Sequence, residues 1–209
     1  MRFSAFACVV VLACSPAPRD ARPDTVDANA ALRDTLVGMG TQDQAGRDSI
    51  ALAVARNDTA FMRRMMQGDS ARTRWLQSFV ATHGWPRRAA FGDSAVLVAW
   101  MIVQHSPDYA FQEQMLPLLE DASMAGEVKP AEIAMLSDRI AAHRGQPQRY
   151  GTQFSLHSDT LVADPIADLT ALDSLRASVG LPPILEYTKV LQAVYKVPVQ
   201  WPPKRRAPR

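Results

Sequence analysis

The sequence contains very little cysteine. Only Cys8 and Cys14 are present among its 209 residues, and both lie close to the N-terminus. The rest of the chain therefore needs no disulfide chemistry and offers no thiol to an enzymatic reaction. If this part of the chain is an enzyme, its nucleophile would have to be a serine, a threonine or a carboxylate.

The motifs of common enzyme classes are also missing. The chain has no GxSxG, no HExxH, no glycine-rich phosphate loop and no pair of histidines four residues apart. Its four histidines are widely spaced, at His83, His105, His143 and His157. The sequence therefore indicates no cofactor and no assigned catalytic residue.

The charge balance lacks a strong excess of either sign. The chain has 23 Lys and Arg against 21 Asp and Glu, which gives a formal net charge of +2. This balance argues against a nucleic-acid-binding protein, which normally presents a basic face. The one basic cluster, Lys204-Arg205-Arg206 with Arg209, is interrupted by prolines. It is either a solvated chain end or a contact for anionic lipid.

The first 14 residues have the pattern of a secretion signal. Arg2 precedes an apolar run, residues 3–13, that is too short to span a bilayer, and Val11-Leu12-Ala13-Cys14 ends it. This arrangement resembles that of bacterial lipoproteins, in which the cysteine thiol is diacylglycerylated, the peptide before it is cut off, and the new amine is usually acylated, commonly with palmitate. The resemblance implies a signal peptide over 1–13 and a membrane anchor at Cys14. An uncleaved anchor and a cytoplasmic N-terminal strand are the alternatives.

Composition divides the mature chain into three parts. Residues 14–28, rich in Pro, Asp, Ala and Arg, are typical of a flexible tether. Residues 29–195 are expected to form the folded domain, and residues 196–209 a Pro/Arg-rich tail. By resemblance to enteric sorting rules, Ser15 after the lipidated cysteine favours the outer membrane, with the domain facing the periplasm.

Hydrophobic periodicity predicts a mainly α fold: a compact multi-helix globular domain with one short β-hairpin near residues 150–163. Residues 95–103 have no polar face, so they form either the central buried helix or a buried strand. Asp108 is expected to cap a helix, and Gly68-Asp69-Ser70 is expected to break one. Residues 43–56 are expected to be helical.

Two short clusters of polar and aromatic residues are candidates for a binding site. The first is His83-Gly84-Trp85-Pro86, with Gln104-His105 further along; the second is the QRYGTQ segment, 148–153. The segment places two amides, a guanidinium, a phenol and a hydroxyl around a glycine. It is either a ligand site or a loop that satisfies its own buried backbone groups.

The same clusters carry a second resemblance. Their order along the chain is similar to that of an uncharacterised bacterial domain family of unknown function, with HGWP, QH and QRYGTQ motifs, over about residues 29–195. The resemblance implies that these positions belong together, but it implies no reaction and no substrate.

The leading hypothesis is a lipid-anchored envelope protein that binds an unknown small molecule or protein. Its predicted pocket is built from His83, Trp85, His105, Arg149, Tyr150 and Gln153. One alternative is an envelope hydrolase that uses a histidine as general base, or a metal held by His83, His105 and His143 with Glu120, Asp121 or Glu132. Another is a structural interaction subunit.

Overall fold

The computed structural model describes residues 29–202 apart from 48 and 57. The predicted signal peptide, Cys14 and the tether therefore lie outside the described residues, as does the basic end of the tail. None of the described helices combines the length and the apolar character that crossing a membrane would require.

The predicted fold class, mainly α with a short hairpin, is confirmed. The helices are α1 (Ala30–Arg47), α2 (Ile50–Ala55), α3 (Thr59–His83), α4 (Arg88–His105), α5 (Tyr109–Met124), α6 (Pro130–His143), α7 (Leu172–Ser178) and α8 (Ile184–Tyr195). The hairpin consists of β1 (Phe154–His157) and β2 (Thr160–Ala163), which pair antiparallel. A third strand, β3 (Val199–Gln200), pairs parallel with β2 within the segment expected to be a tail.

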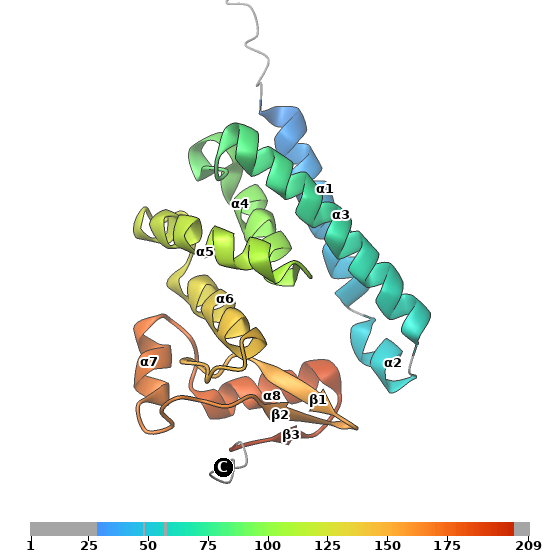
Figure 1. Ribbon diagram of the computed structural model, residues 1–209, viewed down its shortest axis with the longest axis vertical. Coiled ribbons are helices and arrows are strands. Elements are labelled where there is room, and N and C mark those ends of the chain that lie inside the picture. The colour runs from blue at the N-terminus through green and yellow to red at the C-terminus, as the bar shows by residue number, and fades with distance from the viewer. Residues whose placement is uncertain (1–28, 48, 57, 203–209) are drawn as a thin grey trace, which may run out of the picture.

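The elements form two groups along the long axis of the molecule. Figure 1 shows α1 and α3 lying side by side, with α4 and α5 next to them. The other group, at the lower end of the figure, consists of α7, α8 and the small sheet, and α6 lies between the two groups. Helix α6 packs against α5 on one side, and the QRYGTQ loop follows it in the chain. It therefore connects the helical body to the hairpin.

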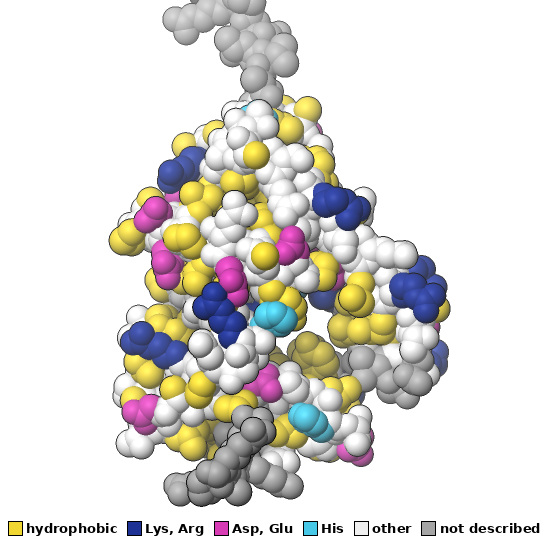
Figure 2. Space-filling model, viewed as in Figure 1, with side chains coloured by type: hydrophobic (Ala, Val, Ile, Leu, Met, Phe, Trp, Pro, Cys, Tyr) yellow, Lys and Arg dark blue, Asp and Glu magenta, His cyan; other side chains and the backbone are white. Residues whose placement is uncertain are grey.

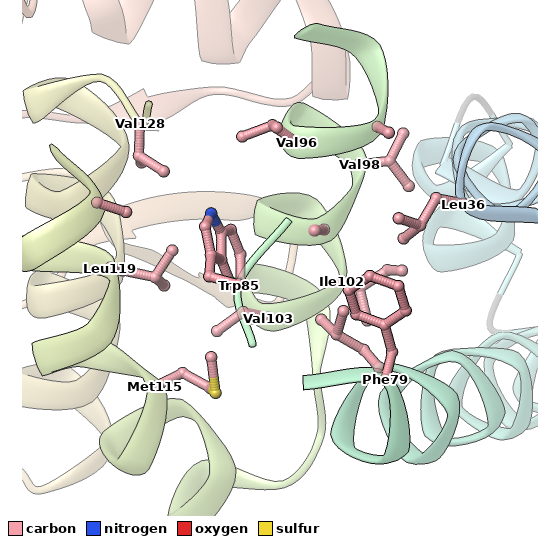
Figure 3. Close-up of a cluster of buried hydrophobic side chains, with 14 of the residues drawn as sticks. Leu36, Phe79, Trp85, Val96, Val98, Ile102, Val103, Met115, Leu119 and Val128 are labelled. Carbon is pink, nitrogen blue, oxygen red and sulfur yellow. The ribbon is translucent and has the colours of Figure 1, made fainter. Parts of the chain in front are cut away.

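The core is centred on α4. Its Val96, Val98, Ile102 and Val103 are buried among side chains from α1, α3 and α5 (Figure 3). Because helices cover α4 on several sides, it needs no polar face, which explains the uniformly apolar segment 95–103. The helical alternative for this segment is confirmed, and the strand alternative is wrong.

Two expectations about helix ends were wrong. Gly68-Asp69-Ser70 does not break the chain, since α3 continues from Thr59 to His83. Asp69 lies on the buried side of α3, where its carboxylate pairs with Arg47 and Arg72, so tertiary contacts override the local break signal. The segment 43–56, in turn, is divided between α1 and α2 rather than forming one helix.

Candidate functional site

A cavity of about 280 Å³ lies where α6, α8 and the hairpin meet the end of α4. The face shown in Figure 2 is hollowed near its centre, between the elements that contribute the lining. Most of the lining is apolar and consists of Ile50, Met135, Phe154, Leu156, Leu161, Leu191 and Val197. The polar lining consists of Gln104, Arg139, Thr152, Gln153, Tyr187 and Tyr195. The cavity therefore has an apolar wall with a few polar groups, which is the composition of small-molecule sites.

Arg139 is the only Lys or Arg among these lining residues, and it has no partner within the described part of the chain. It lies four residues after Met135 on α6, so both side chains are on the helix face that lines the cavity. Its Nε is buried without a hydrogen bond, and no described residue forms an ion pair with its guanidinium. Desolvation by burial lowers the pKa of Arg139, and the nearby charge of Arg47 lowers it further.

Gln104 contributes a second unpartnered group. The side chain is 5% exposed, and its Oε1 is buried without a hydrogen bond to any described residue. Its backbone is held firmly, because Gln112 Nε2 donates to the carbonyls of Val103, Gln104 and Ser106 at 3.0 to 3.3 Å. Those carbonyls lie at the end of α4, where the helix supplies no donors of its own. A rigid helix end therefore places a free amide at the cavity wall.

The main chain of the QRYGTQ loop is fixed by Asp138. This buried carboxylate accepts the backbone N–H groups of Arg149, Tyr150 and Thr152 at 2.7 to 3.1 Å, and also the Thr152 hydroxyl at 3.0 Å. Four donors on one carboxylate replace the hydration that Asp138 loses on burial. Asp138 and Arg139 are neighbours on α6, so one turn of this helix holds the loop and supplies the free cation of the cavity.

Gln148 and Arg176 complete the support of the loop. The Gln148 amide donates to the carbonyls of Gln153 and Asp164 and accepts the N–H of Gln153, all at 2.8 to 2.9 Å. Arg176, which is fully buried, donates to the carbonyls of Pro182, Tyr150 and Gly151. Much of the QRYGTQ motif therefore satisfies its own backbone, as the structural interpretation of the loop expected, and its end places Thr152 and Gln153 at the cavity.

The aromatic side of the cavity is anchored to the same loop. The Tyr187 hydroxyl donates to the Thr152 carbonyl at 3.2 Å. Burial raises the pKa of Tyr187, so the phenol stays neutral and donates at ordinary pH. The guanidinium of Arg176 lies 5.0 Å from the centre of the Tyr187 ring. These two contacts of Tyr187 therefore join the QRYGTQ loop, α7 and α8 beside the cavity.

A separate charged cluster joins α1, α3 and α4. His105 Nδ1 lies 3.1 and 3.0 Å from the two carboxylate oxygens of Asp43, whose side chain is 1% exposed. Arg47 and Arg72 lie within 3.5 Å of the same carboxylate and also pair with Asp69. Burial alone would raise the pKa of Asp43, but the hydrogen bond and charge of His105, followed by those of Arg47, lower it to about 2.

The six residues predicted to form one pocket lie in different places. His83 is exposed at the end of α3, where its ring contacts Phe79 in a tilted arrangement, whereas Trp85 is buried in the core. His105 belongs to the Asp43 cluster. Arg149 and Tyr150 line a more open hollow on the other side of α6. Only Gln153 lines the cavity.

The positive φ of Gly151 explains part of this separation. Its φ of +64° turns the chain between Tyr150 and Thr152, so the two halves of the motif serve different surfaces. A Cβ at Gly151 would also crowd Ile166 at 3.2 Å. Whether the six predicted residues bind a ligand is not decided by their positions and stays a prediction.

The histidines considered as metal ligands make unrelated contacts. His143 stacks on Tyr109 with ring centres 3.3 Å apart, His83 contacts Phe79 with the rings tilted, and His105 pairs with Asp43. Over the described part of the chain, no three His, Cys, Asp or Glu side chains are grouped as a metal site would require.

Sequence reasoning missed Arg139. It pointed to Gln104 only as part of a motif and did not include it among the predicted site residues. The available signal for Arg139 was weak: an arginine on an amphipathic helix, next to Ile140 and four residues after Met135. Such an arginine is normally a solvated or snorkelling side chain. Only the tertiary structure shows that it lies against an apolar cavity.

Residues 30–200 match the Family of unknown function (DUF6624), and the chain belongs to this family. This confirms the expectation of a domain family without an assigned function. No curated protein and no solved structure matches the chain significantly.

Proposed function

We propose that this protein is a lipoprotein of the bacterial cell envelope whose helical domain binds a small molecule in the cavity between α6, α8 and the hairpin. The observation that carries the proposal is the pair of unpartnered polar side chains, Arg139 and Gln104, in a mainly apolar cavity. The signal-like residues 1–13, the box that ends at Cys14 and the polar tether support the envelope anchor. Ser15 favours the outer membrane.

The energetics favour a ligand over an empty cavity. A buried polar group without a hydrogen-bond partner costs about 1–3 kcal/mol, and more if it is charged. Meanwhile Asp138, Gln148 and Arg176, close to the same loop, have multiple partners. Arg139 and Gln104 are the residues of the described cavity lining that keep a buried polar atom without a partner, so these two are available for a partner that is not part of the chain.

The composition of the lining favours binding over catalysis. Among the described lining residues there is no carboxylate and no histidine, so no general base faces the cavity. Polar groups that orient a ligand are present, and a group that would abstract a proton from it near neutral pH is not. The volume of about 280 Å³ corresponds to a small metabolite rather than a polymer.

Filling the cavity tests this proposal. Leu156 lines the cavity and is partly exposed, so Leu156→Trp adds bulk there without replacing a core residue. Leu185→Trp is the matched control, because Leu185 is exposed on α8 and does not line the cavity. Each protein is purified from bacterial envelopes and denatured, and the released small molecules are identified by mass spectrometry.

We expect one compound in about equimolar amount from the wild type and from Leu185→Trp, and a loss of at least about 10-fold from Leu156→Trp. Equal recovery from all three proteins would reject the cavity as the binding site. The anchor is tested separately, because Cys14→Ser should move the protein from the membrane fraction to the soluble fraction.

A hydrolase is the second candidate, and the Asp43–His105 contact is the observation that favours it. A buried carboxylate on imidazole Nδ1 is the arrangement that orients a general base in many hydrolases. The His105 side chain is 21% exposed, so a substrate could reach it. Cleavage of p-nitrophenyl acetate that falls at least about 10-fold in His105→Gln, in a protein that remains folded, would support this candidate. Equal rates in the two proteins would reject it.

A further inference from the structure

The charges around Arg139 identify the kind of ligand that the cavity accepts. The groups that influence this guanidinium are the cation Arg47 and the phenols Tyr109, Tyr187 and Tyr195. Arg47 is itself paired with Asp43 and Asp69. The described lining of the cavity therefore contains one positive charge that no described carboxylate neutralises. Burying a single charge of this kind is costly unless an opposite charge is brought to it.

We propose that the ligand is a small monocarboxylic acid, bound with its carboxylate on Arg139 and its apolar body against the aliphatic wall of the cavity; this inference rests on the proposed function. The planar fork of a guanidinium matches a carboxylate and donates two parallel hydrogen bonds to it. Gln104 lines the same cavity from the end of α4, and its Nε2 is the amide atom that can donate to a carboxylate, whereas its Oε1 can only accept from a donor elsewhere on the ligand.

The charge count favours a carboxylate over a phosphate ester. A phosphate monoester carries close to two negative charges at neutral pH, and one guanidinium would leave the second charge buried. The other polar side chains of the lining, Thr152, Gln153 and the two tyrosines, are neutral. A monocarboxylate is the anion that this single cation neutralises.

The wall of the cavity sets the size and character of the rest of the ligand. Met135, Leu161 and Leu191 contribute flexible or branched aliphatic surface, and Phe154 contributes a ring. A cavity volume of about 280 Å³ is suited to a small molecule. The ligand is thus a small acid whose larger part is apolar.

Titration calorimetry with three probes tests the inference. The probes are octanoate and octanamide, which share one chain and differ in the charge of the head group, and octyl phosphate, whose alkyl chain is one carbon longer and whose head group is a phosphate monoester. The variants are Arg139→Met, which keeps an unbranched side chain, and Arg149→Met as the matched control. Arg149 is exposed and lines the hollow on the other side of α6. Leu156→Trp identifies where the probes bind.

We expect the wild type to bind octanoate at least about 10-fold more tightly than octanamide and than octyl phosphate. Arg139→Met should remove the preference for octanoate over octanamide, and Arg149→Met should retain it. Leu156→Trp should weaken the binding of octanoate and octanamide alike.

Other results would overturn the inference in distinguishable ways. If octanamide bound the wild type as tightly as octanoate, the inference that the ligand is a carboxylic acid would be refuted, while the cavity would still be a binding site. If octyl phosphate bound more tightly than octanoate, the inference that the ligand carries a single negative charge would be refuted. If octanoate did not bind at all, the inference of an acid ligand would also be refuted. The recovery of a co-purified compound would then show independently whether the cavity binds a small molecule. The wild-type comparison needs no variant, so a failure of Arg139→Met to fold leaves the test intact.

Discussion

Replacing Arg139 by methionine should stabilise the protein in the absence of ligand. The guanidinium is partly buried without a partner among the described residues, and methionine removes the unsatisfied charge while retaining an unbranched, shorter apolar side chain. Because an unsatisfied buried group costs about 1–3 kcal/mol, we expect the free energy of unfolding to rise by about 1 kcal/mol. For a domain of this size, that corresponds to an increase of about 2–4 °C in Tm.

Arg176→Met provides the contrasting case in the same protein. Arg176 is fully buried, but its guanidinium donates to the carbonyls of Tyr150, Gly151 and Pro182. Removing it leaves these carbonyls without donors, so we expect a loss of about 3–5 kcal/mol. Urea denaturation of the ligand-free proteins, followed by circular dichroism, measures both effects. If Arg139→Met were destabilising by more than about 1 kcal/mol, Arg139 would be a structural residue, and the reasoning from its missing partner would fail.

Three further predictions concern other parts of the chain. Gly40→Ala should destabilise the protein by about 1–3 kcal/mol in urea melts, since the added Cβ would collide with Val98 on α4. Gly38→Ala in the same helix meets no atom within 4 Å and should be neutral or stabilising by up to about 1 kcal/mol; similar losses in both variants would contradict the packing of α1 on α4. The folded-state pKa of Asp43, about 2, is below the ordinary value of 3.8 for an aspartate, so its contribution of about 2 kcal/mol is present above pH 3.8 and is lost as the pH falls through 2. The stability difference between the wild type and Asp43→Asn should therefore shrink between pH 5 and about pH 2, and a constant difference would refute the lowered pKa. Cys14→Ser should abolish labelling with radioactive palmitate and sedimentation with membranes, and labelling that persists would refute the lipid anchor.

The parts of the fold that depend on neighbouring residues were predictable. The carboxylate of Asp108 accepts the backbone N–H of Phe111 at 3.1 Å, as expected for the cap of a helix. The hairpin likewise follows from the alternation around Phe154 and the turn before Thr160. In both cases the interaction is made within a few residues, so the sequence contains the whole signal.

The mistakes arose where distant parts of the chain meet. The break expected at Gly68 is absent because Asp69 pairs with Arg47, an interaction across 22 residues that local propensity cannot show. The candidate site was missed for the same reason. Gln104, Arg139 and Gln153 come from α4, α6 and the loop after α6, and no spacing in the sequence brings them together.

The QRYGTQ motif shows what a short motif can and cannot indicate. Its polar side chains suggested a ligand site. In the structure, however, the Gln148 side chain hydrogen-bonds the main chain of Gln153 and Asp164, and Asp138 accepts hydrogen bonds from the backbone of the motif. The last two residues, Thr152 and Gln153, reach the cavity. The sequence identified a segment that matters to the architecture, while the division of its residues between supporting the loop and lining the cavity depends on the turn at Gly151.

A crystal structure of the protein purified from bacterial membranes would test the central claim most directly. We predict electron density for a small organic acid in the cavity, with its carboxylate within hydrogen-bonding distance of the Arg139 guanidinium and its apolar part against Met135 and Leu191. A cavity filled by the protein's own side chains, or an Arg139 side chain that forms an ion pair with a carboxylate of the chain, would contradict the account.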